Sequence, residues 1–174
     1  MDREIMNAGK VLQQQILELL RGGNAYMEFD EIVDDFPLDS INDKAPNVPY
    51  SFWQILEHMR IAQWDILEFI RNPDHVSPHY PEGYRPNPAD KADRNRWLKT
   101  IADFKADRQA LEKIVADPQT DLLAPIPHAA GYTIFREILT VADHNSYHLG
   151  ELAMIRQVLD LWPAGRKYLT GAPE

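Results

Sequence analysis

The stretch ILTVADHNSYHLGELAMIRQVL, residues 138–159, combines a helical pattern with two histidines placed one helical turn apart. Its inward positions recur at spacings of three and four, which is typical of a helix with one buried face. These positions form a single seam: Ile138, Val141, Asn145, His148, Leu152, Ile155 and Leu159. Such a helix needs other helices to cover its apolar face, so the stretch favours a helical bundle.

Three further segments show helical signals, and together the four predict an all-α protein, a four-helix bundle with long connecting loops. Ser51 and Gln54 form a capping box, Asp93 suits a first turn, and Thr133 is an acceptable cap for the last helix. The sequence shows no strand pattern and no internal repeat. The expected helices run from Asp2 to Arg21, from Ser51 to Asn72, from about Asp90 to Asp117, and from Thr133 to Trp162.

Two long connectors separate these segments. The first, which ends near Pro49, is long for a bundle and indicates a topology other than a simple up-down-up-down order. The second holds five prolines between Pro73 and Pro88, which excludes a helix and a central strand. We expect a rigid, extended loop over the mouth of a site, with His75 and His79 as surface or lid residues.

The composition narrows the class of protein. With 174 residues, of which 44% are hydrophobic, the chain is expected to form one globular domain over residues 1–174. A net charge of -9 without a basic stripe argues against nucleic-acid binding. The lack of cysteine excludes disulfides, thiolate metal ligands and a cysteine nucleophile. The chain starts with polar residues and contains no long apolar run, so we expect neither a signal peptide nor a membrane span. A cytoplasmic protein is therefore expected.

The two histidines of the last helix suggest a metal site. Residues four apart on a helix lie on the same face, so His144 and His148 can bind one ion. His58, on another helix, borders the buried face there and supplies a third imidazole. Three histidines with one open coordination position are typical of a catalytic metal site. The alternative is a polar core, in which each imidazole is satisfied by hydrogen bonds.

Other metal motifs do not fit. Asn145 stands where a zincin carries its glutamate base, which excludes a metalloprotease of that type. No Glu-x-x-His occurs, which excludes a ferritin-like di-iron site. Haem ligation by a single histidine stays open but has no support, and His128 precedes the last helix as a loop residue.

Three neighbours of the histidine pair are also candidates for a role. Asp143 and Glu151 are placed to orient an imidazole through its second nitrogen, although solvated acids on a helix face would show the same pattern. Gly150 costs helix stability, so it indicates close approach by another helix or by a ligand.

These residues together resemble the DinB-like (DinB/YfiT) superfamily of metal-dependent enzymes. The resemblance covers nearly the whole chain and rests on three motifs: Trp53-Gln54-Ile55-Leu56-Glu57-His58, the loop Ser77 to Tyr84, and the last helix with Arg136-Glu137 and His144 to Gly150. It implies a bundle of unusual connectivity, often a homodimer, with a divalent nickel or zinc ion on three histidines. Carried onto this chain, the metal ligands are His58, His144 and His148. Characterised relatives include thiol-dependent S-transferases and maleylpyruvate isomerases.

The leading hypothesis is therefore a metal-dependent enzyme, an S-transferase or a hydrolase, that acts on a small-molecule substrate. The ion would lower the pKa of a bound water or thiol. Because the chain has no cysteine, the thiol would be a low-molecular-weight cosubstrate. Asn145 and Tyr147 are candidates to position the substrate. Two alternatives stay open: a non-catalytic bundle that binds a small ligand or partner around a structural or adventitious ion, and a metal-storage or sensing protein.

Overall fold

Four long helices make up most of the molecule. The computed structural model describes residues 2–164. A short helix, α2, follows the first long one, and two strands precede the last. The elements are α1 (Asp2–Arg21), α2 (Phe29–Val33), α3 (Phe52–Arg71), α4 (Arg94–Ala116), β1 (Pro125–Ile126), β2 (Ala129–Thr133) and α5 (Ile134–Val158), with single 3-10 turns at Leu38–Ser40 and Glu82–Tyr84. The expected all-α bundle is confirmed.

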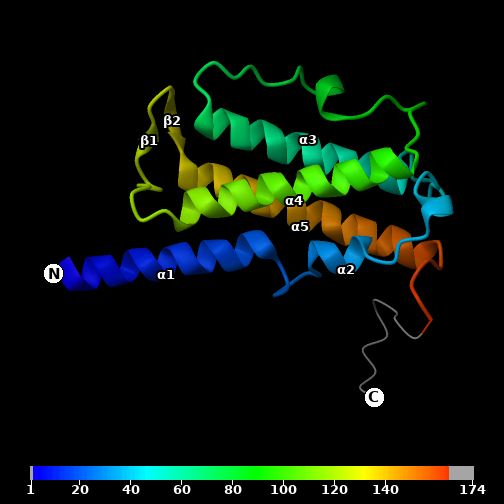
Figure 1. Cartoon of the computed structure of the whole chain (residues 1–174), viewed down its shortest axis with the longest axis horizontal. Helices are drawn as coiled ribbons and strands as arrows, with labels where there is room; N and C mark the ends of the chain where they lie inside the picture. The colour runs from blue at the N-terminus through cyan, green and yellow to red at the C-terminus, as the bar shows by residue number, and fades with distance from the viewer. Residues whose placement is uncertain (1, 165–174) are drawn as a thin grey trace.

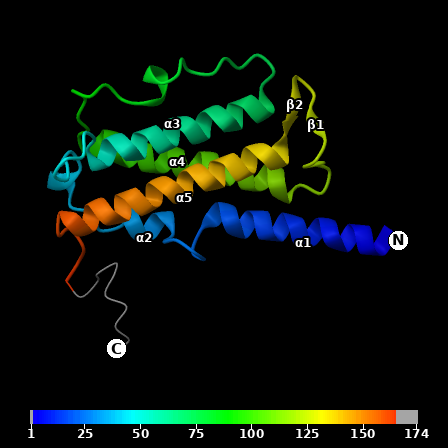
Figure 2. The same ribbon diagram turned by 180° about the vertical axis from the view of Figure 1, so that it is seen from behind.

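The order of directions around the bundle is not up-down-up-down. In Figure 1, α3 and α4 run the same way along the bundle, and α1 and α5 run the opposite way. Figure 2 shows α5 lying between α3 and the line formed by α1 and α2. Two parallel neighbours need a connection that returns along the whole length of the bundle. The segment 72–93 makes that return over α3 (Figure 1), whereas the sequence pattern had pointed to the first connector as the cause of the unusual topology.

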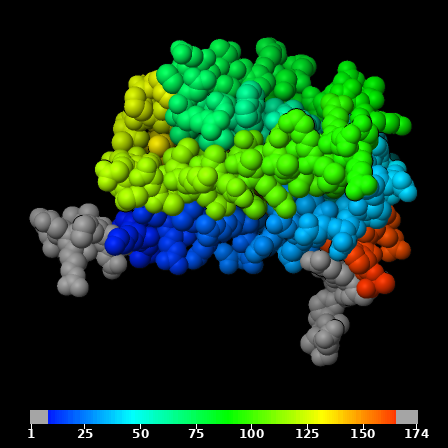
Figure 3. Space-filling model, viewed as in Figure 1, coloured from blue at the N-terminus to red at the C-terminus, as the bar shows by residue number. Residues whose placement is uncertain are grey.

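The first connector contains α2, which the sequence pattern did not reveal. Glu28 and Glu31 form a capping box that starts this helix, and Phe29 and Ile32 are fully buried. In the space-filling view α1 and α2 follow one another along the same edge (Figure 3), so together they act as the fourth member of the bundle. Buried Arg156 of α5 donates to the carbonyl oxygen of Ile32 at 2.8 Å, which ties α2 to α5.

Local signals at the helix starts explain most boundaries. Ser51 and Gln54 form the expected capping box, and Thr133 caps α5 by accepting a hydrogen bond from the Arg136 amide. One expectation is wrong: the third long helix does not begin near Asp90. Asp93 is its N-cap rather than a first-turn residue, because its carboxylate accepts a hydrogen bond from the backbone at Arg96.

A small antiparallel ribbon joins α4 to α5. β1 pairs with β2, with Ile126 opposite Ala129. His128 lies in the turn between them and hydrogen-bonds to the carbonyl oxygen of Phe69 at 2.8 Å, as a loop residue remote from the other histidines. The ribbon was not anticipated, since strands this short show no alternating pattern. Of the described helices, none has the length and apolarity that crossing a bilayer requires.

Candidate metal centre

Three histidines meet between α3 and α5. His58 comes from the middle of α3, and His144 and His148 lie one turn apart on α5. The Nε2 atoms of His58 and His144 are 3.1 Å apart, and the ring of His148 lies 4.8 Å from that of His58 and 4.5 Å from that of His144. The three residues chosen from helical spacing therefore form one half-buried cluster.

Hydrogen bonds fix two of the rings with one nitrogen turned toward the cluster. The Nδ1 of His58 donates to the backbone oxygen of Tyr84 at 2.8 Å. The Nδ1 of His148 donates to the carboxylate of Glu151 at 2.7 Å. Because these oxygens only accept, each Nδ1 carries a proton, and in a neutral ring the Nε2 then presents a lone pair. This is the second-nitrogen arrangement that metal-bound histidines usually have.

The surroundings also keep the imidazoles neutral. Burial lowers the pKa of His58, and the nearby cation of Arg85 lowers it further, although the hydrogen bond to Tyr84 opposes the shift. Burial, reinforced by the charges of His148 and His58, lowers the pKa of His144 to about 3. Both rings are therefore neutral at pH 7, which is the form that binds a metal ion.

The cluster fits a divalent transition-metal ion. Two nitrogens bound to one zinc ion at about 2.0–2.1 Å lie at most about 4.2 Å apart. One nitrogen from each of the three histidines lies within 4.8 Å of the other two, so a small rotation of an imidazole brings all three into range. Among the described residues no cysteine or carboxylate joins this group, and three ligands leave a position of a four-coordinate ion open.

A cavity of about 510 Å³ reaches the histidines from the surface. His58 and His148 form part of its wall, whereas His144 lies behind them. The remaining wall is mostly apolar with a few polar groups: Val48, Pro49, Tyr50, Gln54, Ile55, Arg85, Pro86, Tyr147, Glu151, Met154 and Ile155. This size and mixture are typical of a site for a small organic molecule.

The segment 72–93, which we call the strap, forms one side of the site. Buried Asp65 of α3 holds it at two points: its carboxylate lies 2.7 Å from the Nε2 of His75 and accepts a 2.5 Å hydrogen bond from the hydroxyl of Tyr84. The backbone oxygen of the same Tyr84 accepts the hydrogen bond from His58. Through Tyr84, Asp65 thus helps to fix the position of His58, a candidate metal ligand.

One expectation about the strap is met only in part. His75 was expected as a surface or lid residue; it belongs to the strap, but only 7% of its side chain is exposed, and its ring packs edge-on against Trp64. His79 is exposed, as expected, and pairs with Glu82. The sequence carried a weak signal for the difference, since Asp65 is an acid on the predicted buried border of its helix.

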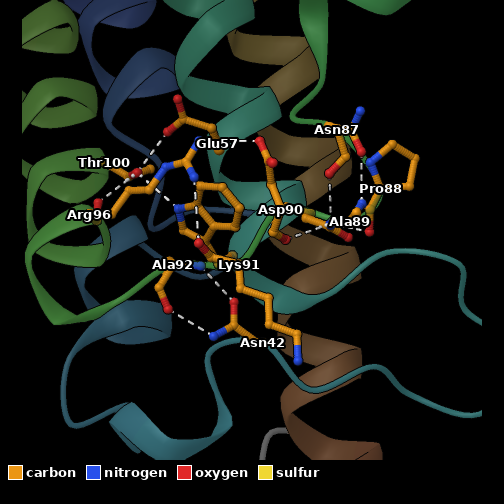
Figure 4. Close-up of polar contacts among 12 residues, drawn as sticks. Asn42, Glu57, Asn87, Pro88, Ala89, Asp90, Lys91, Ala92, Arg96 and Thr100 are labelled. Atoms are coloured by element: carbon orange, nitrogen blue, oxygen red, sulfur yellow. Dashed lines mark hydrogen bonds and ion pairs between the residues drawn. The ribbon is translucent and has the colours of Figure 1, made fainter.

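The far end of the strap is fastened by two amide side chains. The Nε2 of Gln54 donates to the backbone oxygens of Asn87, Pro88 and Asp90 at 3.1 to 3.3 Å. Asn42 exchanges two hydrogen bonds with the backbone of Ala92, at 2.8 and 2.9 Å (Figure 4). These contacts hold the strap against the start of α3, so the cavity wall that it forms is well defined.

The five candidate residues near the histidine pair differ in burial and contacts. Tyr147 is exposed and lines the cavity, whereas Asn145 is buried and donates to the side-chain oxygen of Gln63 at 2.9 Å. Asp143 is exposed and, in the part of the chain that the structure describes, does not contact the cluster; Glu151 does. No other helix approaches Gly150 closely, because an added Cβ there would meet no heavy atom within 4 Å, so of the two expected explanations only approach by a ligand stays a prediction.

Comparison with known proteins gives a match to one family model. The family model described as the DinB superfamily matches residues 23–152, which include all three histidines. No curated protein and no solved structure matches the chain significantly.

Proposed function

The chain belongs to the DinB superfamily, and we propose that it is a metal-dependent enzyme whose divalent ion, zinc or nickel, binds His58, His144 and His148. The observation that carries the proposal is the convergence of three imidazoles, two of which line an organic-sized cavity. A purely structural metal site is normally closed by four protein ligands, whereas the group here has three.

The protein supplies orientation and a partly apolar environment. Glu151 and the backbone of Tyr84 keep the lone pairs of His148 and His58 directed at one point. Imidazole ligands are neutral, so a bound divalent ion keeps its full charge and acts as a Lewis acid that lowers the pKa of a water or thiol. Tyr147 stands at the cavity wall, where its hydroxyl can contact a substrate.

The reaction that we propose is thiol-dependent group transfer or hydrolysis on a small molecule. In the transfer reaction a low-molecular-weight thiol loses its proton, its sulfur forms a bond to an electrophilic carbon, and the leaving group departs with the electron pair. The thiol must come from outside the protein, because the chain contains no cysteine. In the hydrolytic reaction water takes the place of the thiol.

The first test is metal content by elemental mass spectrometry on untagged protein. We expect about one zinc or nickel per chain in the wild type and none in His58→Ala or His148→Ala. His79→Ala is the matched control, because it removes an exposed histidine outside the cluster. Metal retained by both ligand variants would contradict the site.

The second test is turnover by the metal-loaded protein. We would screen 1-chloro-2,4-dinitrobenzene with cysteine, glutathione or coenzyme A, and 4-nitrophenyl acetate without a thiol. Activity should disappear with a chelator and in His144→Ala, and return when zinc is added back to the wild type only. Turnover that survives both treatments would exclude metal-dependent catalysis.

A further inference from the structure

One cation lines the cavity without a carboxylate partner. Arg85 belongs to the cavity wall, and among the described residues it forms no ion pair. Six other arginines in the described chain pair with carboxylates: Arg21, Arg60, Arg71, Arg96, Arg108 and Arg136. In a protein of net charge -9, an exposed arginine at a cavity that has no carboxylate partner attracts an anion.

Contacts with Tyr50 hold the guanidinium of Arg85 in place and leave most of its N–H donors available. It donates to the hydroxyl of Tyr50 and lies over the ring of the same residue, 4.7 Å from its centroid. Its neighbour Tyr84 is fixed to Asp65, and Gln54 fastens the strap two and three residues further on. A guanidinium has five N–H donors in a planar fork, so most remain available for the two oxygens of a carboxylate.

The rest of the cavity defines where the anion can lie. Glu151 is the one carboxylate in the wall, and the histidine side of the cavity contains it. In the metal-free protein an anionic group is therefore attracted to Arg85, on the strap, rather than to Glu151. The wall also includes Ile55, Pro86 and Ile155, which suit an apolar body.

From these observations we propose that Arg85 binds the carboxylate of an organic acid, whose apolar part lies against the apolar wall of the cavity. The inference rests on the proposed function only for what happens at the histidine end. Recognition of the carboxylate requires Arg85, Tyr50 and the fastened strap, and it does not require a bound ion.

The test compares hexanoate with hexanamide, two probes of similar shape that differ in charge. Binding is measured by calorimetry with zinc-loaded protein and with chelator-treated protein. Hydrogen bonds to a charged group contribute about 1.5–3 kcal/mol, so hexanoate should bind about tenfold or more tighter in both forms. Arg85→Gln should abolish the difference, and Arg85→Lys should keep part of it. Arg94→Gln, an exposed arginine outside the cavity wall, is the matched control.

Three results would overturn the inference. The first is equal binding of the two probes to the wild type. The second is a hexanoate preference that survives Arg85→Gln. The third is a preference found only with zinc present, which would place the carboxylate on the ion. A protein that binds no metal but shows the Arg85-dependent preference would instead contradict the proposed function and leave the anion site intact.

Discussion

The Nδ1 of His58 donates a 2.8 Å hydrogen bond to the backbone oxygen of Tyr84, twenty-six residues further along the chain. This bond links a helix to the strap at the point where the strap passes the histidine cluster. The Tyr84 hydroxyl in turn donates a hydrogen bond to Asp65, a buried residue of α3. The orientation of His58 therefore depends on a contact that lies outside the cluster itself.

Removing that contact should weaken metal binding without unfolding the protein. Tyr84→Phe loses the hydrogen bond to Asp65 but keeps the aromatic ring and the backbone oxygen. Outer partners of metal ligands typically change metal affinity by about 10–100-fold, and we expect the lower end here because the backbone acceptor remains. Competition with a chromophoric chelator measures the zinc affinity. Tyr80→Phe, an exposed tyrosine of the same strap, should leave it unchanged.

The metal-free protein should become less stable as the pH decreases, because of His144. Its pKa is lowered to about 3 in the folded protein, against about 6.5 in the unfolded chain. Between these values the unfolded state binds the proton and the folded state does not. The free energy of unfolding therefore decreases as the pH falls below about 6.5, by roughly 2 kcal/mol at pH 5 for this one group.

Urea unfolding with a chelator at pH 7.5 and pH 5 measures this loss. His144→Leu should show a smaller decrease between the two pH values than the wild type. The matched control is His79→Gln, which removes an exposed histidine. Equal pH dependence in the wild type and His144→Leu would show that His144 is protonated in the folded protein at pH 5.

Local signals in the sequence predicted the helices and the histidines well. The capping box at Ser51 defines the start of α3. The spacing of four residues puts His144 and His148 on the same face of α5. The phase of the apolar positions then placed His58 at the border of the buried face of its helix. These predictions succeeded because each depends on residues within a few turns of one helix.

The parts that were missed depend on contacts between distant segments. The strap has no periodicity, and its path is decided by side chains such as Gln54 and Asp65 that bind its backbone and its rings. The burial of His75 follows from that path and from nothing in its own neighbourhood. Helix α2 has five residues, too few for a helical pattern to emerge from the sequence.

The charge of Glu151 should influence both His148 and Tyr147. The carboxylate accepts a hydrogen bond from the Nδ1 of His148. Its separate hydrogen bond with Tyr147, together with its charge, raises the pKa of Tyr147. Glu151→Gln should lower zinc affinity by about tenfold or more and should bring the pKa of Tyr147 down. Carbon-13 NMR of labelled tyrosines follows that titration. Asp143→Asn, which changes an exposed acid of the same helix, should change neither quantity.

The buried amide of Asn145 should contribute to stability rather than to metal binding. Its Nδ2 donates to the Oε1 of Gln63 at 2.9 Å, and the Nε2 of Gln63 donates to the carbonyl of Phe104 at 2.8 Å, so this chain of bonds joins α5, α3 and α4. Asn145→Leu leaves a buried oxygen of Gln63 without its donor, which costs about 1–3 kcal/mol. We expect a lower urea midpoint and unchanged metal content, with Asn95→Leu on the exposed side of α4 as the control. Unchanged stability with loss of turnover would instead assign Asn145 to the substrate.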